Sequence, residues 1–192
     1  MGRPKAFEVD EALDRAMAVF WAKGFEAATI QDLVEATGVQ RQSLYATFGD
    51  KRQLFLKALD RYRLQRGQIR AALLEEDAPV RVLLGRLLRG VLETLESQGR
   101  RGCMMVNTAS DALQLEAEMV ALVETNIQDL KASLAICLRR AQARGELGGH
   151  QDPEALACFF VNALYGLNTL GKVVKDRDTL DAIVKVTLAV LG

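Results

Sequence analysis

The chain contains a single histidine, His150, among its 192 residues, and three cysteines, Cys103, Cys137 and Cys158. His150 lies in a Gly-Gly turn with no cysteine or second histidine at metal-ligand spacing, so the sequence predicts no metal site and no serine-histidine triad. A phosphate-binding glycine loop is missing as well. We therefore expect neither enzyme activity nor a bound cofactor.

Long apolar runs are also lacking. No run approaches the roughly 18 residues needed to cross a bilayer, and the basic N-terminus precedes a charged amphipathic helix instead of a signal-peptide core. Three cysteines are an odd number in a chain without export features, so reduced thiols are expected. These features predict a cytoplasmic protein that does not bind a membrane.

The chain has no net charge, because 25 Lys and Arg residues balance 25 Asp and Glu residues. Any affinity for nucleic acid must therefore come from a local patch. Residues 1–66 hold 11 of the basic and 9 of the acidic residues, which leaves 14 and 16 for the remainder. The first third of the chain is thus mildly positive.

Residues 29–51, TIQDLVEATGVQRQSLYATFGDK, contain a pattern of two short helices joined by a glycine turn. Thr29 can cap the first helix, and Asp32 can bond in return to the exposed amides. That helix is expected to end at Gly38, because glycine adopts the left-handed conformation most easily. The second helix is expected over residues 40–47.

This second helix has a buried stripe and a free face. Leu44 and Phe48 lie four residues apart and supply the stripe. The free face carries side chains that can hydrogen-bond to base edges or phosphates in a major groove, namely Gln40, Arg41, Gln42, Ser43 and Tyr45. The arrangement is typical of a DNA-reading helix-turn-helix.

With the residues before it, this segment closely resembles the N-terminal DNA-binding domain of the TetR family of transcriptional regulators, over roughly residues 16–56. Residues that stand where the family pattern places them are Ala16, Phe20, Gly24, Phe25, Thr29, Ile30, Leu33, Gly38, Val39, Ser43, Leu44, Tyr45, Phe48 and Lys51. The resemblance implies that residues 40–47 form the recognition helix. It also implies that Tyr45 and Lys51 touch phosphates and that Thr29 anchors the preceding helix on the DNA backbone.

Two departures from the family pattern make the operator sequence harder to predict. Gln40 stands where the family usually has a capping serine, and Ala46 with Thr47 replaces a larger polar or aromatic pair. Ahead of the first helix, Arg3 belongs to a short basic arm that could enter a minor groove. The alternative for this arm is a disordered terminus.

Helical periodicity continues to the end of the chain and predicts an all-α protein of about nine helices with no strand. Later helices are expected over residues 51–74, 80–97, 103–113, 116–144, 153–174 and 178–191. We place the domain boundary at residue 50. Residues 1–50 would form the helix-turn-helix DNA-binding domain, and residues 51–192 a helical regulatory, ligand-binding and dimerisation domain.

The last two predicted helices are apolar around nearly their whole circumference, so each must be buried on more than one side. The TetR resemblance implies that they form a four-helix interface with a second copy of the chain. The expected interface residues are Leu156, Phe159, Leu167, Leu170, Ile183, Val186 and Val190. Burial within one subunit is the alternative. Such a homodimer would hold two recognition helices about 34 Å apart and prefer a palindromic operator in double-stranded DNA.

Polar side chains on otherwise apolar helices predict a ligand pocket, because a buried amide needs a partner that a ligand can supply. The amides that fit this description are Asn107, Asn126 and Asn162. Asn168 fits the same description. The expected apolar walls are Tyr62, Met104, Met119, Phe160 and Tyr165, and Cys103 is a further expected pocket residue. Ordinary core packing is the alternative for each. The TetR resemblance implies that a small organic ligand bound there releases a repressor from DNA.

Two further functions stay open. The segment from Gly102 to Asn107 resembles the start of the sixth helix in one group of TetR-family repressors, and some relatives there sense electrophiles or oxidants through cysteine. Cys103, at a helix N-terminus behind Arg100 and Arg101, could be such a reactive thiol, or it could be buried and inert. The helix-turn-helix could also serve as a protein-interaction module.

Overall fold

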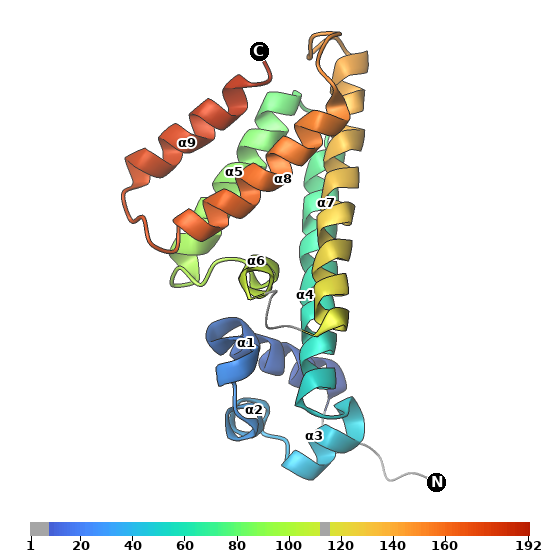
Figure 1. Cartoon of the computed structure of the whole chain (residues 1–192), viewed down its shortest axis with the longest axis vertical. Coiled ribbons are helices and arrows are strands. Elements are labelled where there is room, and N and C mark those ends of the chain that lie inside the picture. The colour runs from blue at the N-terminus through green and yellow to red at the C-terminus, as the bar shows by residue number, and fades with distance from the viewer. Residues whose placement is uncertain (1–7, 112–115) are drawn as a thin grey trace.

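The computed structural model describes residues 8–111 and 116–192, which form nine α-helices and no strand. The predicted all-α class is therefore confirmed. The helices are α1 Val9–Ala27, α2 Ile30–Thr37, α3 Arg41–Phe48, α4 Lys51–Glu75, α5 Val80–Ser97, α6 Met104–Ser110, α7 Ala117–Ala143, α8 Pro153–Leu170 and α9 Arg177–Ala189. Figure 1 shows α1, α2 and α3 at one end of the molecule and the bundle of α5, α7, α8 and α9 at the other. The predictions for Arg3 and for the end of the sixth helix at residue 113 lie outside the described residues.

Local capping sets the ends of α2, as the sequence predicted. The side-chain oxygen of Thr29 accepts a hydrogen bond from the amide of Asp32 at 3.1 Å, and the amide of Thr29 donates to the Asp32 carboxylate at 2.9 Å. Gly38 ends the helix with a φ of +70°, and its amide donates to the carbonyl oxygen of Val34 at 2.9 Å. The Asp50 side chain caps α4 by accepting a hydrogen bond from the amide of Gln53 at 2.8 Å.

Helix α8 ends at Leu170, four residues before its predicted end at Val174. The side chain of Arg100 explains the difference. Its Nη1 donates to the carbonyl oxygens of Gly171 and Val174 at 2.8 and 2.9 Å. Carbonyl groups left without helical partners are thus satisfied from a distant segment, which periodicity alone does not reveal.

Buried side chains form two clusters, and α4 belongs to both. The first cluster unites α1, α2, α3 and the first half of α4, including Phe20, Leu33 and Leu59. The second lies in the bundle and includes Leu74 from the last turn of α4. The helix that follows residue 50 therefore shares the core of the helices that precede it. A displacement of α4 would be transmitted to both parts of the molecule.

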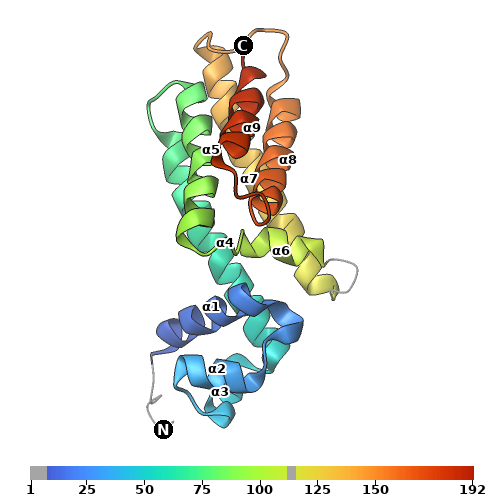
Figure 2. The same ribbon diagram turned by 90° about the vertical axis from the view of Figure 1, so that its left-hand side faces the viewer.

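Charged contacts also link α4 to α1 and to the start of α7. Arg61 of α4 forms two hydrogen bonds with the Asp14 carboxylate of α1, at 2.5 and 2.7 Å. The same guanidinium lowers the pKa of Asp14. Near the start of α4, Arg52 pairs with Glu116 and with Glu118, the latter at 2.9 Å. Figure 2 shows α6 between α1 and the bundle of α5, α7, α8 and α9.

Candidate functional site

The exposed face of α3 is the candidate nucleic-acid interface. Leu44 and Phe48 are 2% and 3% exposed and hold the helix against the core. The predicted free face is exposed at Gln40, Arg41, Gln42 and Ser43 and partly exposed at Tyr45. The division of this helix into a buried stripe and a polar face is therefore confirmed, while contact with DNA stays a prediction.

Side chains on this face are partly preorganised. The guanidinium of Arg41 lies over the ring of Tyr45, 5.3 Å from its centroid, a distance at which cation–π attraction operates. Gln40 occupies the N-cap position but makes no side-chain capping hydrogen bond. The side-chain amide of Gln40 is therefore left available for an external partner. In the family that the sequence resembles, a serine at this position usually caps the helix instead.

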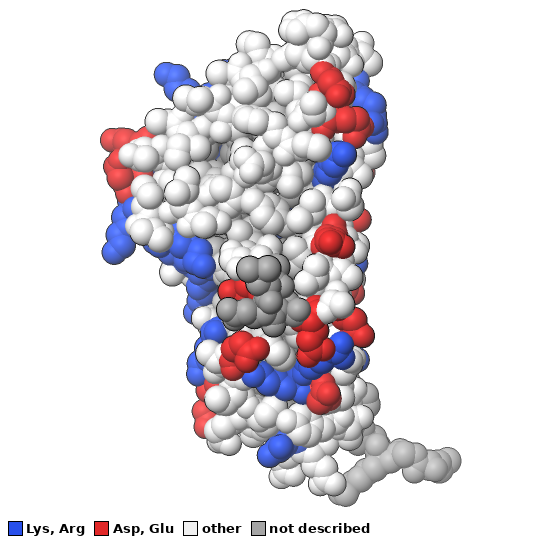
Figure 3. Space-filling view, in the orientation of Figure 1, with Lys and Arg blue, Asp and Glu red and all other residues white. Residues whose placement is uncertain are grey.

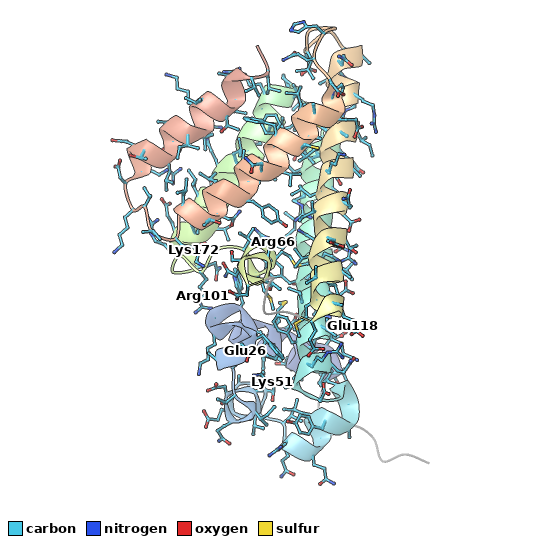
Figure 4. All side chains as sticks on the ribbon, viewed as in Figure 1. Glu26, Lys51, Arg66, Arg101, Glu118 and Lys172 are labelled. Carbon is cyan, nitrogen blue, oxygen red and sulfur yellow. The ribbon has the colours of Figure 1, made fainter. Side chains whose placement is uncertain are left out.

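Lys51 and Thr29, both expected at the DNA backbone, have defined positions. The Nζ of Lys51 donates to the carbonyl oxygen of Glu26 at 3.2 Å and lies 4.7 Å from the centroid of the Phe25 ring. Figure 4 shows Lys51 beside Glu26, at the end of α1. Thr29 is exposed at the N-cap of α2, where helical amides point outward.

Asp32 controls the charge near that N-cap. Its carboxylate accepts a hydrogen bond from Lys23 at 2.7 Å as well as the bond from the Thr29 amide. The Lys23 contact, followed by the contacts with Thr29, lowers the pKa of Asp32 to about 2. The carboxylate therefore remains ionised at neutral pH and holds Lys23 close to the start of α2.

A cavity of about 440 Å³ lies among α4, α5, α6, α7 and α8. Its size is within the range of small-molecule sites, roughly 300–1,000 Å³. Four of the predicted ligand residues line it, namely Tyr62, Cys103, Asn126 and Tyr165, together with Asn168. Residues from α4, α7 and α8 and from the segment before α6 are thus brought together, as the sequence interpretation required.

The structure does not bring the other predicted ligand residues to this cavity. Met104 and Asn107 line a separate pocket of about 330 Å³ against α1. Met119 belongs to the first core cluster and Phe160 to the second, and Asn162 is exposed. Periodicity shows that a helix face is buried but does not identify what covers it. The N-terminal end of α7 packs toward α4, which places Met119 in the DNA-binding domain's core.

Asn126 provides the most informative contact in the cavity wall. This residue is 3% exposed, and its Nδ2 donates to the hydroxyl of Tyr165 at 3.2 Å. Its buried Oδ1 has no hydrogen-bond partner among the described residues. A buried amide oxygen without a partner costs free energy, and a ligand with a hydrogen-bond donor would remove that cost. Burial also raises the pKa of Tyr165, so its hydroxyl stays protonated at neutral pH.

Arg66 and Arg70 are among the residues of the cavity wall that sequence reasoning missed. Both belong to the helix expected over residues 51–74. A signal was nevertheless available, because Tyr62, Arg66 and Arg70 follow one another at intervals of four residues and must share a face of α4. Figure 4 marks Arg66 near the level of α6.

The predicted dimer residues divide into three groups by their exposure. Phe159, Leu170 and Val186 are exposed by 39%, 46% and 70%, which leaves them free to meet a second chain. Leu156, Ile183 and Val190 are partly buried. Leu167 is only 2% exposed and packs in its own subunit's core, so for this residue the alternative of internal burial holds. Figure 3 shows few charged side chains over the broad face formed by α8 and its neighbours.

The described part of the chain shows neither a metal-binding cluster nor a membrane-spanning helix. No group of three or more histidine, cysteine, aspartate or glutamate side chains there is arranged to hold a metal ion. None of the described helices combines the length and the apolar character needed to span a membrane.

An exposed helix-turn-helix, joined through a shared helix to a bundle with a cavity, defines a DNA-binding regulator with a sensory domain. Residues 12–58 match the model of the bacterial regulatory proteins of the tetR family. Residues 80–187 match the model of the tetracyclin repressor-like C-terminal domain. The chain belongs to the TetR family of transcriptional regulators.

Individual relatives agree over nearly the whole chain. The HTH-type transcriptional regulator YezE of Bacillus subtilis is 33% identical and covers 100% of both chains. The HTH-type transcriptional repressor ComR of Escherichia coli is also 33% identical, over 97% of this chain and 90% of its own. A solved structure of a cysteine-substituted form of the regulator CifR, bound to 26-bp double-strand operator DNA, is 34% identical, with a TM-score of 0.85 and 100% coverage of both chains.

Proposed function

We propose that this protein is a repressor that binds palindromic operator DNA as a homodimer and leaves it when a small organic ligand fills the cavity. The observation that carries the proposal is the polar face of α3, exposed at Gln40, Arg41, Gln42 and Ser43 and fixed from behind by buried Leu44 and Phe48. The DNA-bound CifR structure and the repressor ComR support it by similarity. A regulator of this kind acts in the cytoplasm, where bacterial DNA lies.

The side chains divide by the part of DNA that each would meet. Gln40, Arg41, Gln42 and Ser43 follow one another at the start of α3, where a recognition helix contacts base edges and nearby phosphates. Tyr45, Lys51 and Thr29 would contact phosphates, which fix register without reading sequence. The Arg41–Tyr45 stack, 5.3 Å from guanidinium to ring centroid, holds a basic and a hydroxyl group together for this purpose.

Homodimerisation would use α8 and α9. The exposed apolar side chains of Phe159, Leu170 and Val186 lie on these helices, and the face in Figure 3 carries few charges that would need to be desolvated. A two-fold axis there would pair the two chains and set the separation of their α3 helices. Half-sites one turn of DNA apart, about 34 Å, or a multiple of that distance, would then bind best.

Ligand release follows from the position of the cavity between the two core clusters. Tyr62 and Gly102 line the cavity, and both also contact Trp21 of α1. A ligand that changes the placement of α4 or α6 would therefore move α1 and, through the shared core, α3. The ligand can shift DNA affinity only by the difference between its affinities for the two arrangements.

Fluorescence anisotropy with duplex DNA from around the protein's own gene, at two salt concentrations, tests this function. The wild-type protein is expected to bind tightly, with an affinity that falls as salt rises. Tyr45→Ala should lose most of that affinity, whereas Arg89→Ala, an exposed site on α5, should retain it. Equal binding by Tyr45→Ala and the wild type would contradict the proposed role of α3. Absence of salt-dependent binding would favour the protein-interaction module.

A second candidate function, thiol sensing, is favoured by one observation. Cys103 lies in the cavity wall and is only partly buried, so an electrophile that enters the cavity would meet its sulfur. Mild oxidation should then abolish DNA binding by the wild type but not by Cys103→Ser. Oxidation without effect on DNA binding would exclude this function.

A further inference from the structure

One wall of the cavity carries two positive charges. Tyr62, Arg66 and Arg70 line it from successive turns of α4. At 1.5 Å per residue, the eight residues from Tyr62 to Arg70 span about 12 Å of helix axis. The two guanidinium groups therefore project from the same face, one turn apart, where like charges repel each other.

Neither arginine has an acidic partner. Among the described residues Arg70 makes no ion pair or hydrogen bond, and Arg66 makes only a 3.5 Å contact with the hydroxyl of Thr94. Residues 1–7 and 112–115 contain no aspartate or glutamate that could supply one. The neighbouring arginines of α4 behave differently, since Arg61 pairs with Asp14 and Arg63 with Asp60 and Asp129.

Other charges at the cavity do not compensate for the two arginines. Glu93 is the one carboxylate in the described lining; it is exposed and forms no ion pair with either arginine. Arg86 also reaches the lining but is paired with Glu76 at 2.6 Å. Burial, joined by the positive charge of Arg66, lowers the pKa of Arg70. The wall therefore lacks negative charge at the position of these two guanidinium groups.

The rest of the lining is largely apolar, with Leu73, Leu87, Val91, Leu130 and Leu164 among its residues. Its polar members outside α4 include Thr94, Ser97, Asn126 and Asn168. Among the described residues, the buried Oδ1 of Asn126 has no hydrogen-bond partner, while its Nδ2 donates to the hydroxyl of Tyr165. If the amide were turned by 180°, its nitrogen would be the atom without that partner.

We propose that the ligand of this cavity is an organic carboxylate with an apolar body, its carboxylate bound by Arg66 and Arg70. A planar carboxylate suits the fork of donors on a guanidinium, and the pair would relieve the repulsion between the two cations. The aliphatic lining would cover the body. This inference rests on the proposed function, in which the cavity is the effector site.

The test is calorimetric titration of the DNA-free full chain with straight-chain carboxylates from butanoate to dodecanoate, each beside its primary amide. At least one carboxylate should bind about tenfold or more tightly than its amide, the ratio expected for a charge-assisted contact of about 1.5–3 kcal/mol. Arg66→Gln and Arg70→Gln should each reduce that ratio toward one. Arg89→Gln removes a charge from exposed α5 and should leave it unchanged. Circular dichroism verifies that each variant folds. Arg70→Lys keeps the positive charge but lacks the planar set of guanidinium donors, so it tests the charge alone.

Three results would overturn the proposal. These are equal binding of acids and amides, an unchanged ratio in both Arg→Gln variants, and tighter binding of the matching alkyl sulfonates, which carry the same single negative charge but no carboxylate. Binding of operator DNA is measured separately on the same preparation. If the chain binds carboxylates but no DNA, the proposed function is contradicted and the proposed ligand class stands. If the chain binds DNA but no carboxylate, DNA binding stands and the proposed ligand class is contradicted.

Discussion

The indole Nε1 of Trp21 donates a hydrogen bond to the carbonyl oxygen of Gly102 at 2.8 Å. This bond ties α1 of the DNA-binding domain to the segment that leads into α6. The indole ring also meets Tyr62 edge-on, with ring centroids 5.3 Å apart. Since Gly102 and Tyr62 both line the cavity, the proposed ligand release predicts that Trp21 transmits a change in the cavity to α1.

Replacement of Trp21 by phenylalanine should weaken this link without emptying the core, because an aromatic ring remains. The lost hydrogen bond is expected to lower the free energy of unfolding by about 1 kcal/mol. It should also reduce the factor by which a bound ligand lowers DNA affinity. Urea unfolding and DNA titration with and without ligand measure the two effects. An unchanged ligand effect on DNA affinity would show that coupling takes another route.

Lys51→Gln should weaken binding to every DNA sequence by a similar factor, because a phosphate contact carries no sequence information. The slope of log affinity against log salt concentration should fall by about one for the lost phosphate contact. Since Lys51 also bonds to Glu26, the melting temperature must be measured beside the affinity. A change confined to certain operator sequences would argue for a different role of this lysine.

Asp32 should make the stability of the protein depend on pH. Its pKa in the folded state is about 2, below the ordinary value of 3.8, chiefly because of the hydrogen bond from Lys23. Its contribution is therefore complete above about pH 4 and is lost as the pH falls toward 2. The difference in unfolding free energy between wild type and Asp32→Asn should shrink over that range. A difference independent of pH would contradict the role of the ionised carboxylate.

A charge placed on the apolar face of α8 and α9 should prevent dimerisation. Val186 is 70% exposed, so Val186→Glu should leave the subunit folded. Sedimentation of this variant should show a monomer. Its affinity for operator DNA should be greatly weakened. Ile136→Glu provides the matched control, because Ile136 is 59% exposed on α7. If Val186→Glu stays dimeric, or if both variants dissociate, the interface lies elsewhere.

Local features of the fold could be predicted from the sequence because the interactions that set them span few residues. Thr29 and Asp32 form a reciprocal cap within four residues, and Gly38 supplies the positive φ that ends α2. Leu44 and Phe48 are enough to orient α3, so the polar face of the recognition helix could be predicted as well.

The cavity could be predicted only in part, because its walls are assembled from distant segments. Asn126 was found because an amide on an apolar helix is conspicuous, and Tyr62 was expected as an apolar wall. Met119 was assigned to it wrongly, because periodicity does not distinguish a cavity wall from a core. Arg70 was missed for the opposite reason: a basic residue on a long helix is usually solvated, and only packing reveals that it lacks an acidic partner.

The most direct test of the account is to capture fragments of the source genome with the purified full-length chain and sequence those retained. A dimer that reads DNA through two α3 helices should enrich a palindrome with half-sites about one helical turn apart, or a multiple of one. Tyr45→Ala should enrich nothing. Enrichment of a single unrepeated half-site, or of no sequence by the wild type, would contradict the account.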